Sequence, residues 1–307
     1  MSSKNNSLAT LLIIVLAIIW GSSFILMKKG LIVYTPYQVG AIRMFCSLLF
    51  LAPFLAGHFK KIERSRWKYL LIAGLCGNGI PAILFPLAET RISSALAGMV
   101  NSMVPIFTFI IGLIFFKMKN DRTKMFGLII GLVGAVLFVS AGGGVGNETH
   151  SNYTFFVVIA TICYAISVNT IRRHLLGIDA IRNTGFALLF AGIPLGIYLF
   201  STDFISRTVS SPDAMFSLSC VIVLALFGTA ISTILFNHLI RISDALVASS
   251  VTYLIPVVAV LWGLIDGEKP EPIHYLGFVL IIAGVYLVSK PKLIKSELPL
   301  SAEKKSL

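Results

Sequence analysis

The chain has 307 residues, of which 57% are hydrophobic and only 12% charged, with a mean hydropathy of +0.91. Soluble globular chains carry about twice this charged fraction, so the composition excludes an ordinary soluble domain and indicates a polytopic membrane protein. The net charge of +12 does not indicate a nucleic-acid partner, because the basic residues gather in short loops between apolar runs, as in membrane proteins.

The first apolar run begins at residue 8 and is about 20 residues long, enough to cross a hydrocarbon core. It exceeds a signal-peptide core and no A-x-A-like cleavage site follows it, so we expect it to stay attached as the first span. Nine further apolar runs follow, and their helices leave so little polar surface that the bilayer must be their solvent. The ten expected spans are 8–27, 36–56, 68–88, 93–116, 124–141, 153–172, 183–201, 215–239, 244–266 and 273–289.

Lysine and arginine are distributed unevenly between alternate loops. With the N-terminus placed inside, nineteen of the 25 fall on the cytoplasmic side and five on the other, and Arg43 lies within a span. The positive-inside rule therefore predicts that both termini are cytoplasmic.

The chain repeats itself once. The sequence RISSAL at 91–96 returns as RISDAL at 241–246, and each copy opens a span with a proline near its middle, Pro105 and Pro256. We therefore expect a cytoplasmic N-terminus, a first repeat, an external linker, a second repeat and a cytoplasmic tail, at residues 1–7, 8–141, 142–152, 153–289 and 290–307.

Each repeat holds five expected spans. Because five is odd, the second repeat must enter the membrane upside down relative to the first, which is the inverted-repeat plan of many secondary transporters. The expected fold is an all-α membrane protein of ten transmembrane helices, built as two inverted five-helix repeats around a central cavity.

These features resemble the drug/metabolite transporter superfamily, specifically its ten-helix EamA-type members, over residues 10–290. In place of the glutamate that commonly follows the fourth span in that family, this chain has Lys117. The resemblance is carried by WGSSF at 20–24, Pro36 followed by Arg43, Ser-x-Ala before a mid-span proline in the fourth and ninth spans, a near match to Gly-x-Glu-x-Pro at 267–271, and Gly277 with Gly284.

The resemblance implies a secondary transporter or facilitator of the bacterial inner membrane, working by alternating access without a cofactor. Its partners would be the lipid bilayer and a small organic solute: a metabolite, an amino acid or a drug-like compound. Export or exchange is the expected direction, and the resemblance does not name the solute.

Two residue types mark the expected site. Matching mid-span prolines free backbone carbonyls and point to a midplane binding site with helix hinges at Pro105 and Pro256; the alternative is a plain packing kink.

Arg43, the one ionisable side chain well inside a span, needs a partner there, and Glu89 is the nearest candidate for an ion pair. Arg43 would contact an anion or carboxylate near the outer gate. The alternatives are that its side chain extends to the outer lipid headgroups or that it stabilises helix ends.

Polar and aromatic residues within the spans complete the candidate cavity. Such groups face the bundle rather than lipid, either lining a cavity or bonding neighbouring helices. The candidates are Trp20, Ser23, Arg43, Asn78, Asn101, Ser102, Tyr164, Asn169, Thr252, Tyr253 and Trp262.

Enzyme chemistry is not expected. The sequence has no paired carboxylates, HExxH, CxxC or GxSxG constellation, so we assign no catalytic residue, metal or cofactor. An integral-membrane enzyme acting on a lipid-linked substrate and a non-transporting scaffold or sensor remain as rivals. Gly127 and Gly131 form a GxxxG motif that serves either packing within the chain or a homodimer.

We expect Pro105→Ala and Pro256→Ala each to impair transport, because alanine restores the amide that each proline removes and lets the helix run straight. Transport rates of the two variants, measured at equal expression, check this. Unchanged rates in both would mean that the prolines serve packing alone.

Overall fold

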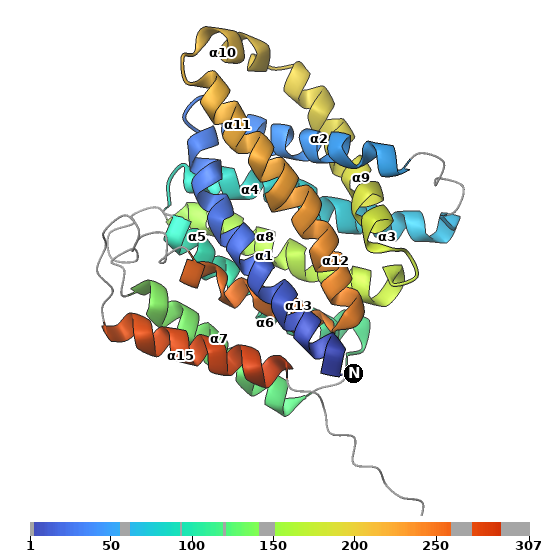
Figure 1. The fold of residues 1–307 in the computed structure, drawn as a ribbon, viewed down its shortest axis with the longest axis vertical. Helices are drawn as coiled ribbons and strands as arrows, with labels where there is room; N and C mark the ends of the chain where they lie inside the picture. The colour runs from blue at the N-terminus through green and yellow to red at the C-terminus, as the bar shows by residue number, and fades with distance from the viewer. Residues whose placement is uncertain are drawn as a thin grey trace, which may run out of the picture.

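The computed structural model describes residues 3–55, 62–92, 94–118, 121–140, 151–258 and 272–289 (Figure 1). Within these ranges the chain is helical and contains no strand, which confirms the expected all-α class. Six helical runs in the described part are long and apolar enough to cross a membrane. Helix occupies part of each expected span, but the count of ten and the inverted repeat stay predictions.

The described part of the first half forms seven α-helices, one π-helical segment and the short 3-10 helix η2 (Arg64–Arg66). The third expected span runs without a break from α3 through η3 to α4, whereas the fourth is divided between α5 and α6. The elements are α1 (Ser3–Gly30), α2 (Pro36–Leu55), α3 (Trp67–Gly74), η3 (Leu75–Gly79), α4 (Ile80–Glu89), α5 (Ser94–Asn101), α6 (Val104–Phe116) and α7 (Arg122–Ser140).

The described part of the second half also consists of helices and short π and 3-10 segments. Helix α10 (Phe204–Ser210) lies between the expected spans 183–201 and 215–239. The other elements are α8 (Ser151–Thr170), η4 (Ile171–Leu175), α9 (Ala180–Phe200), α11 (Ala214–Ala225), η5 (Leu226–Ile231), α12 (Ser232–Ile242), α13 (Ala245–Ser249), η6 (Ser250–Tyr253) and α15 (Pro272–Ser289).

Large apolar side chains lie on the outside of the bundle as well as inside it. Phe115 is 74% exposed and Ile197 70%, while Leu16 and Phe186 are fully buried. Helices that are apolar on both faces need an apolar solvent on the outer one. The chain is therefore a multi-pass membrane protein.

Helices α7 and α15 pack antiparallel at one edge of the bundle, through glycines (Figure 1). A Cβ on Gly284 would lie 2.6 Å from the Gly131 Cα and 2.7 Å from the Gly127 carbonyl oxygen. The two backbones therefore meet directly, and the GxxxG motif is occupied by packing within the chain. A homodimer stays a prediction, but these glycines do not supply its contact.

The glycine seam generates a stability prediction. Gly284→Ala should lower the free energy of unfolding by about 1–3 kcal/mol, because the added methyl meets backbone that cannot move aside. Gly98→Ala is the matched control, since its Cβ would meet only Ile255 Cγ2, at 3.9 Å. Denaturation of the two purified variants in the same detergent measures both, and an equally stable Gly284→Ala protein would contradict the packing described.

Candidate functional site

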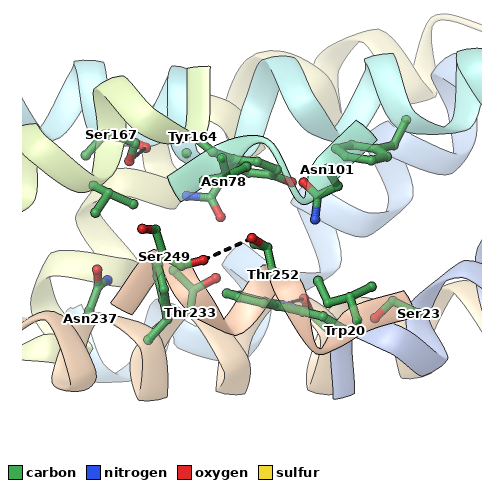
Figure 2. A pocket seen from close by; sticks show the side chains of 18 of the residues that line it. Trp20, Ser23, Asn78, Asn101, Tyr164, Ser167, Thr233, Asn237, Ser249 and Thr252 are labelled. Atoms are coloured by element: carbon green, nitrogen blue, oxygen red, sulfur yellow. Dashed lines mark hydrogen bonds between the residues drawn. The ribbon is translucent and has the colours of Figure 1, made fainter. Parts of the chain in front are cut away.

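A cavity of about 110 Å³ lies at the centre of the bundle, between the two halves of the chain. Figure 2 shows Asn78, Asn101, Tyr164 and Ser167 on one wall, facing a second wall formed by α1, α12, α13 and η6. The predicted residues that line it are Trp20, Ser23, Arg43, Asn78, Asn101, Tyr164 and Thr252.

Both mid-span prolines stand where a helix starts again. Helix α5 ends at Asn101, and Pro105 is the second residue of α6. In the second half the chain tightens to the 3-10 turn η6, and Pro256 lies in the first turn of the helix that resumes at Ile255. A proline costs little there because the first turn has no intrahelical acceptor for its missing amide. The prolines thus open new helices rather than kink continuous ones.

The two interruptions meet at the cavity wall. The Ser102 hydroxyl donates to the Gly98 carbonyl at 3.1 Å or to the Thr252 carbonyl at 3.2 Å, so a residue of the first break contacts a backbone group freed by the second. Asn101 and Thr252, the neighbours of these two interruptions, face the cavity (Figure 2). Both halves therefore contribute one broken helix to the same site.

Arg43 is half-buried and anchored to the opposite half. Its Nε donates to Thr229 Oγ1 at 2.6 Å and its Nη2 to the Gly228 carbonyl at 3.4 Å. That carbonyl lies in the π-helical segment η5 and also accepts from Trp20 Nε1 at 3.2 Å. Nη1 has no acceptor within the described part of the chain, and Arg43 lines the cavity. The guanidinium is thus held on one side by η5.

Arg43 and Glu89 make no direct hydrogen bond within the described residues, and their ion pair stays a prediction. Arg43 turns to Thr229 and Gly228 instead, and both carboxylate oxygens of Glu89 are buried with no hydrogen-bond partner among the described residues. The segment η5 offers Arg43 acceptors that the sequence does not reveal. A π turn leaves a carbonyl without its usual α-helical donor.

Three other predicted cavity residues bond helices together instead. Asn169 Nδ2 donates to the Thr108 carbonyl at 2.9 Å, and the Tyr253 hydroxyl donates to the Leu128 carbonyl at 2.8 Å. Ser102 makes the contact between the two breaks. None of the three is among the residues that line the cavity, and Trp262 lies outside the described residues.

Sequence reasoning missed several polar residues of the cavity wall. Three of them line the half of the wall formed by α9 and α12: Asn183, Thr233 and Asn237. Thr233 and Asn237 are four residues apart on α12, which puts them on one face of that helix. That spacing was a signal from which this polar face could have been found. Ser167 and Ser249 also line the cavity.

Polar contacts join the halves beyond one end of the cavity, where α1 connects to α2 and α9 to α11. Gln38 Nε2 donates to Asp203 Oδ1 at 2.7 Å, and Arg207 Nε pairs with Asp203 Oδ2 at 2.7 Å. The hydrogen bond from Arg207, helped by the one from Gln38, holds the pKa of the Asp203 carboxyl below its ordinary value. Ser217 adds a bond to the Lys29 carbonyl at 2.9 Å.

A second set of contacts lies beyond the opposite end, where α8 connects to α9 and α12 to α13. Arg172 Nη1 donates to the Ile240 carbonyl and Arg241 Nη1 to the Ile178 carbonyl, each at 2.9 Å. Lys124 and Asp244 form an ion pair between the start of α7 and the start of α13. Of these three contacts, the Lys124–Asp244 pair joins the first half of the chain to the second.

The chain matches the model of the EamA-like transporter family over residues 7–140 and again over 152–290. These two ranges lie over the two expected repeats. A crystal structure of a protein 17% identical in sequence superposes with a TM-score of 0.71, covering 92% of this chain and 96% of that one. At that identity the likeness shows the shared fold alone.

Curated relatives match along nearly their whole length. The uncharacterized inner membrane transporter YedA of Escherichia coli (strain K12) is 28% identical over 94% of this chain and 92% of its own. An uncharacterized transporter of Archaeoglobus fulgidus is 26% identical over 89% and 95%. A protein named probable terminal-alkyne amino-acid exporter, of Streptantibioticus cattleyicolor, is 21% identical over 91% and 92%.

The stability of a Glu89 variant tests whether the Glu89 carboxylate lacks a partner or is paired with Arg43, as the sequence analysis expects. Glu89→Leu should raise the free energy of unfolding by about 1–3 kcal/mol, because it removes a buried polar group that no hydrogen bond compensates. Chemical denaturation in detergent measures the change, with Glu63→Leu at an exposed site as control. A loss of stability of several kcal/mol would mean that Glu89 is paired after all.

Proposed function

Because the chain belongs to the EamA-like transporter family, we propose that it carries a small carboxylate-bearing solute out of the cell across the inner membrane by alternating access. Family membership makes it a membrane transporter and not an enzyme. The solute class, the direction and the mechanism are the proposed part.

The single observation that carries the solute class is the arginine in the cavity wall. Arg43 is held by Thr229 and Gly228 and keeps one nitrogen without an acceptor in the described part of the chain. A guanidinium presents its donors in a fixed plane that suits a carboxylate. Because Arg43 lines the cavity between the halves, it is the proposed anion contact.

The cavity volume supports a solute the size of an amino acid. At roughly 10–15 Å³ for each water-sized group, the cavity of about 110 Å³ has room for roughly seven to eleven non-hydrogen atoms. Aromatic side chains in the wall, among them Phe85, Tyr164 and Phe236, would pack against the apolar part of such a solute.

Export and the inner membrane are proposed from relatives. The printed names of YedA and of the Streptantibioticus protein describe an inner membrane transporter and an amino-acid exporter. The excess of basic residues in alternate loops supports cytoplasmic termini. The repeated family match supports two repeats related by inversion.

Alternating access would then be a change in how the two halves meet. We propose that α5–α6 and α13–η6 move about the interruptions before Pro105 and Pro256. In one state the Gln38–Asp203 contact would open, and in the other the Lys124–Asp244 pair, because each joins one half to the other. The contact between Ser102 and Thr252 would act as the fulcrum.

The proposal predicts that Arg43→Gln lowers kcat/KM for the solute at least about tenfold, since a hydrogen bond to a charged group contributes about 1.5–3 kcal/mol. Arg43→Lys should recover only part, because lysine lacks the planar fork. The first measurement is metabolite analysis of the medium of cells that overproduce each variant at equal level, followed by flux in proteoliposomes.

The matched control for this experiment is Arg91→Gln, which removes an exposed arginine outside the cavity. It should leave export at the wild-type rate. Export of a carboxylate solute that survives Arg43→Gln unchanged would contradict the assigned contact. A wild-type protein that exports only solutes without a carboxylate would contradict the solute class.

A further inference from the structure

Two buried asparagines line the part of the cavity that is remote from Arg43. Asn183 on α9 and Asn237 on α12 are each 2% exposed, and both line the cavity. The Oδ1 atom of each has no hydrogen-bond partner among the described residues. More than nine in ten buried polar groups of native proteins are paired, so two unpaired acceptors in one part of a cavity need an explanation.

The orientation of the Asn237 amide is fixed by its neighbour. Asn237 Nδ2 donates to Thr184 Oγ1 at 2.8 Å, and the Thr184 hydroxyl donates its own hydrogen to the Ala180 carbonyl at 2.8 Å. Since that hydrogen is used, Thr184 can only accept from Asn237, and the amide nitrogen must face it. The free oxygen therefore points away from Thr184, and Figure 2 shows the Asn237 side chain rising from α12 toward the cavity.

The path from η5 along α12 gives an approximate distance to the anion contact. Thr229, which holds Arg43, lies in η5, and Asn237 lies eight residues further on, in α12, on the order of 10 Å along the helix axis at about 1.5 Å per residue in the α-helical part. A solute of roughly ten atoms that binds Arg43 through its carboxylate would place its other end near Asn237. The α-amino group of an amino acid bound to Arg43 through its carboxylate lies too close to Arg43 to contact Asn237.

We infer that Asn183 and Asn237 form a subsite that accepts hydrogen bonds from an ammonium or amide group at the far end of the solute. This inference rests on the proposed function and narrows it. Each buried carbonyl oxygen lacks a donor that the solute would supply, and leaving it unpaired is unfavourable. No carboxylate lines the described cavity, so the subsite takes neutral and cationic N–H donors alike. Solutes with an apolar end leave both oxygens unpaired and are rejected.

The test uses three probes of similar length that share a carboxylate and differ at the far end: L-lysine, L-glutamine and L-norleucine. The purified full-length protein is reconstituted in proteoliposomes and the flux of each probe is measured. The wild type should carry lysine or glutamine with a kcat/KM about tenfold above that of norleucine. Asn237→Leu should bring that ratio close to one, and so should Asn183→Leu.

Asn169→Leu is the matched control, a buried asparagine that bonds helices outside the cavity wall. It should keep the wild-type ratio even if it lowers the amount of folded protein. Equal flux of all three probes through the wild type would overturn the subsite and leave the proposed transport of carboxylates intact. Absence of flux for every probe would overturn the subsite together with the proposed solute class. A ratio that survives in both Asn237→Leu and Asn183→Leu would also overturn it.

Discussion

Every backbone polar group within a bilayer must find its partner inside the protein, and this constraint decides where the helices of this chain can be interrupted. The π turn η5 leaves the Gly228 carbonyl to be taken by Trp20 and Arg43. The break after α5 brings the Ser102 hydroxyl to a carbonyl of η6. Interruptions are thus confined to the interior, where another segment satisfies them. The irregular backbone therefore lies beside the cavity, where segments of the protein rather than lipid surround it.

The same rule separates polar side chains that bind helices together from those available to a solute. Asn169 and Tyr253 each use their donor on the carbonyl of a neighbouring helix. Asn237 also uses its nitrogen on a neighbour, but its oxygen has no partner in the described chain. Whether a buried polar group is structural or functional therefore depends on which of its atoms remain unpaired, and residue type alone does not decide it.

The sequence predicted the membrane class, the helical ranges and the two proline-marked interruptions, since these depend on composition and local backbone chemistry. It also identified Trp20, Asn78 and Thr252 as cavity residues, because polar groups in apolar runs face the interior. It did not predict the partner of Arg43 or the inward face of α12. A π turn inserts one residue and rotates everything beyond it by about 100°. Three such segments interrupt the spans, and no local pattern marks them.

The seam between the halves is not symmetrical. Ser102 reaches across to the Thr252 carbonyl, whereas Tyr253, its counterpart in the second repeat, turns to Leu128 on α7. Two identical inverted halves would make the inward-facing and outward-facing forms mirror one another, with equal free energies. If the chain works by the proposed alternating access, divergence at this contact removes that degeneracy. The empty protein would then favour one of the two forms, and the preference would be encoded in residues that never touch the solute.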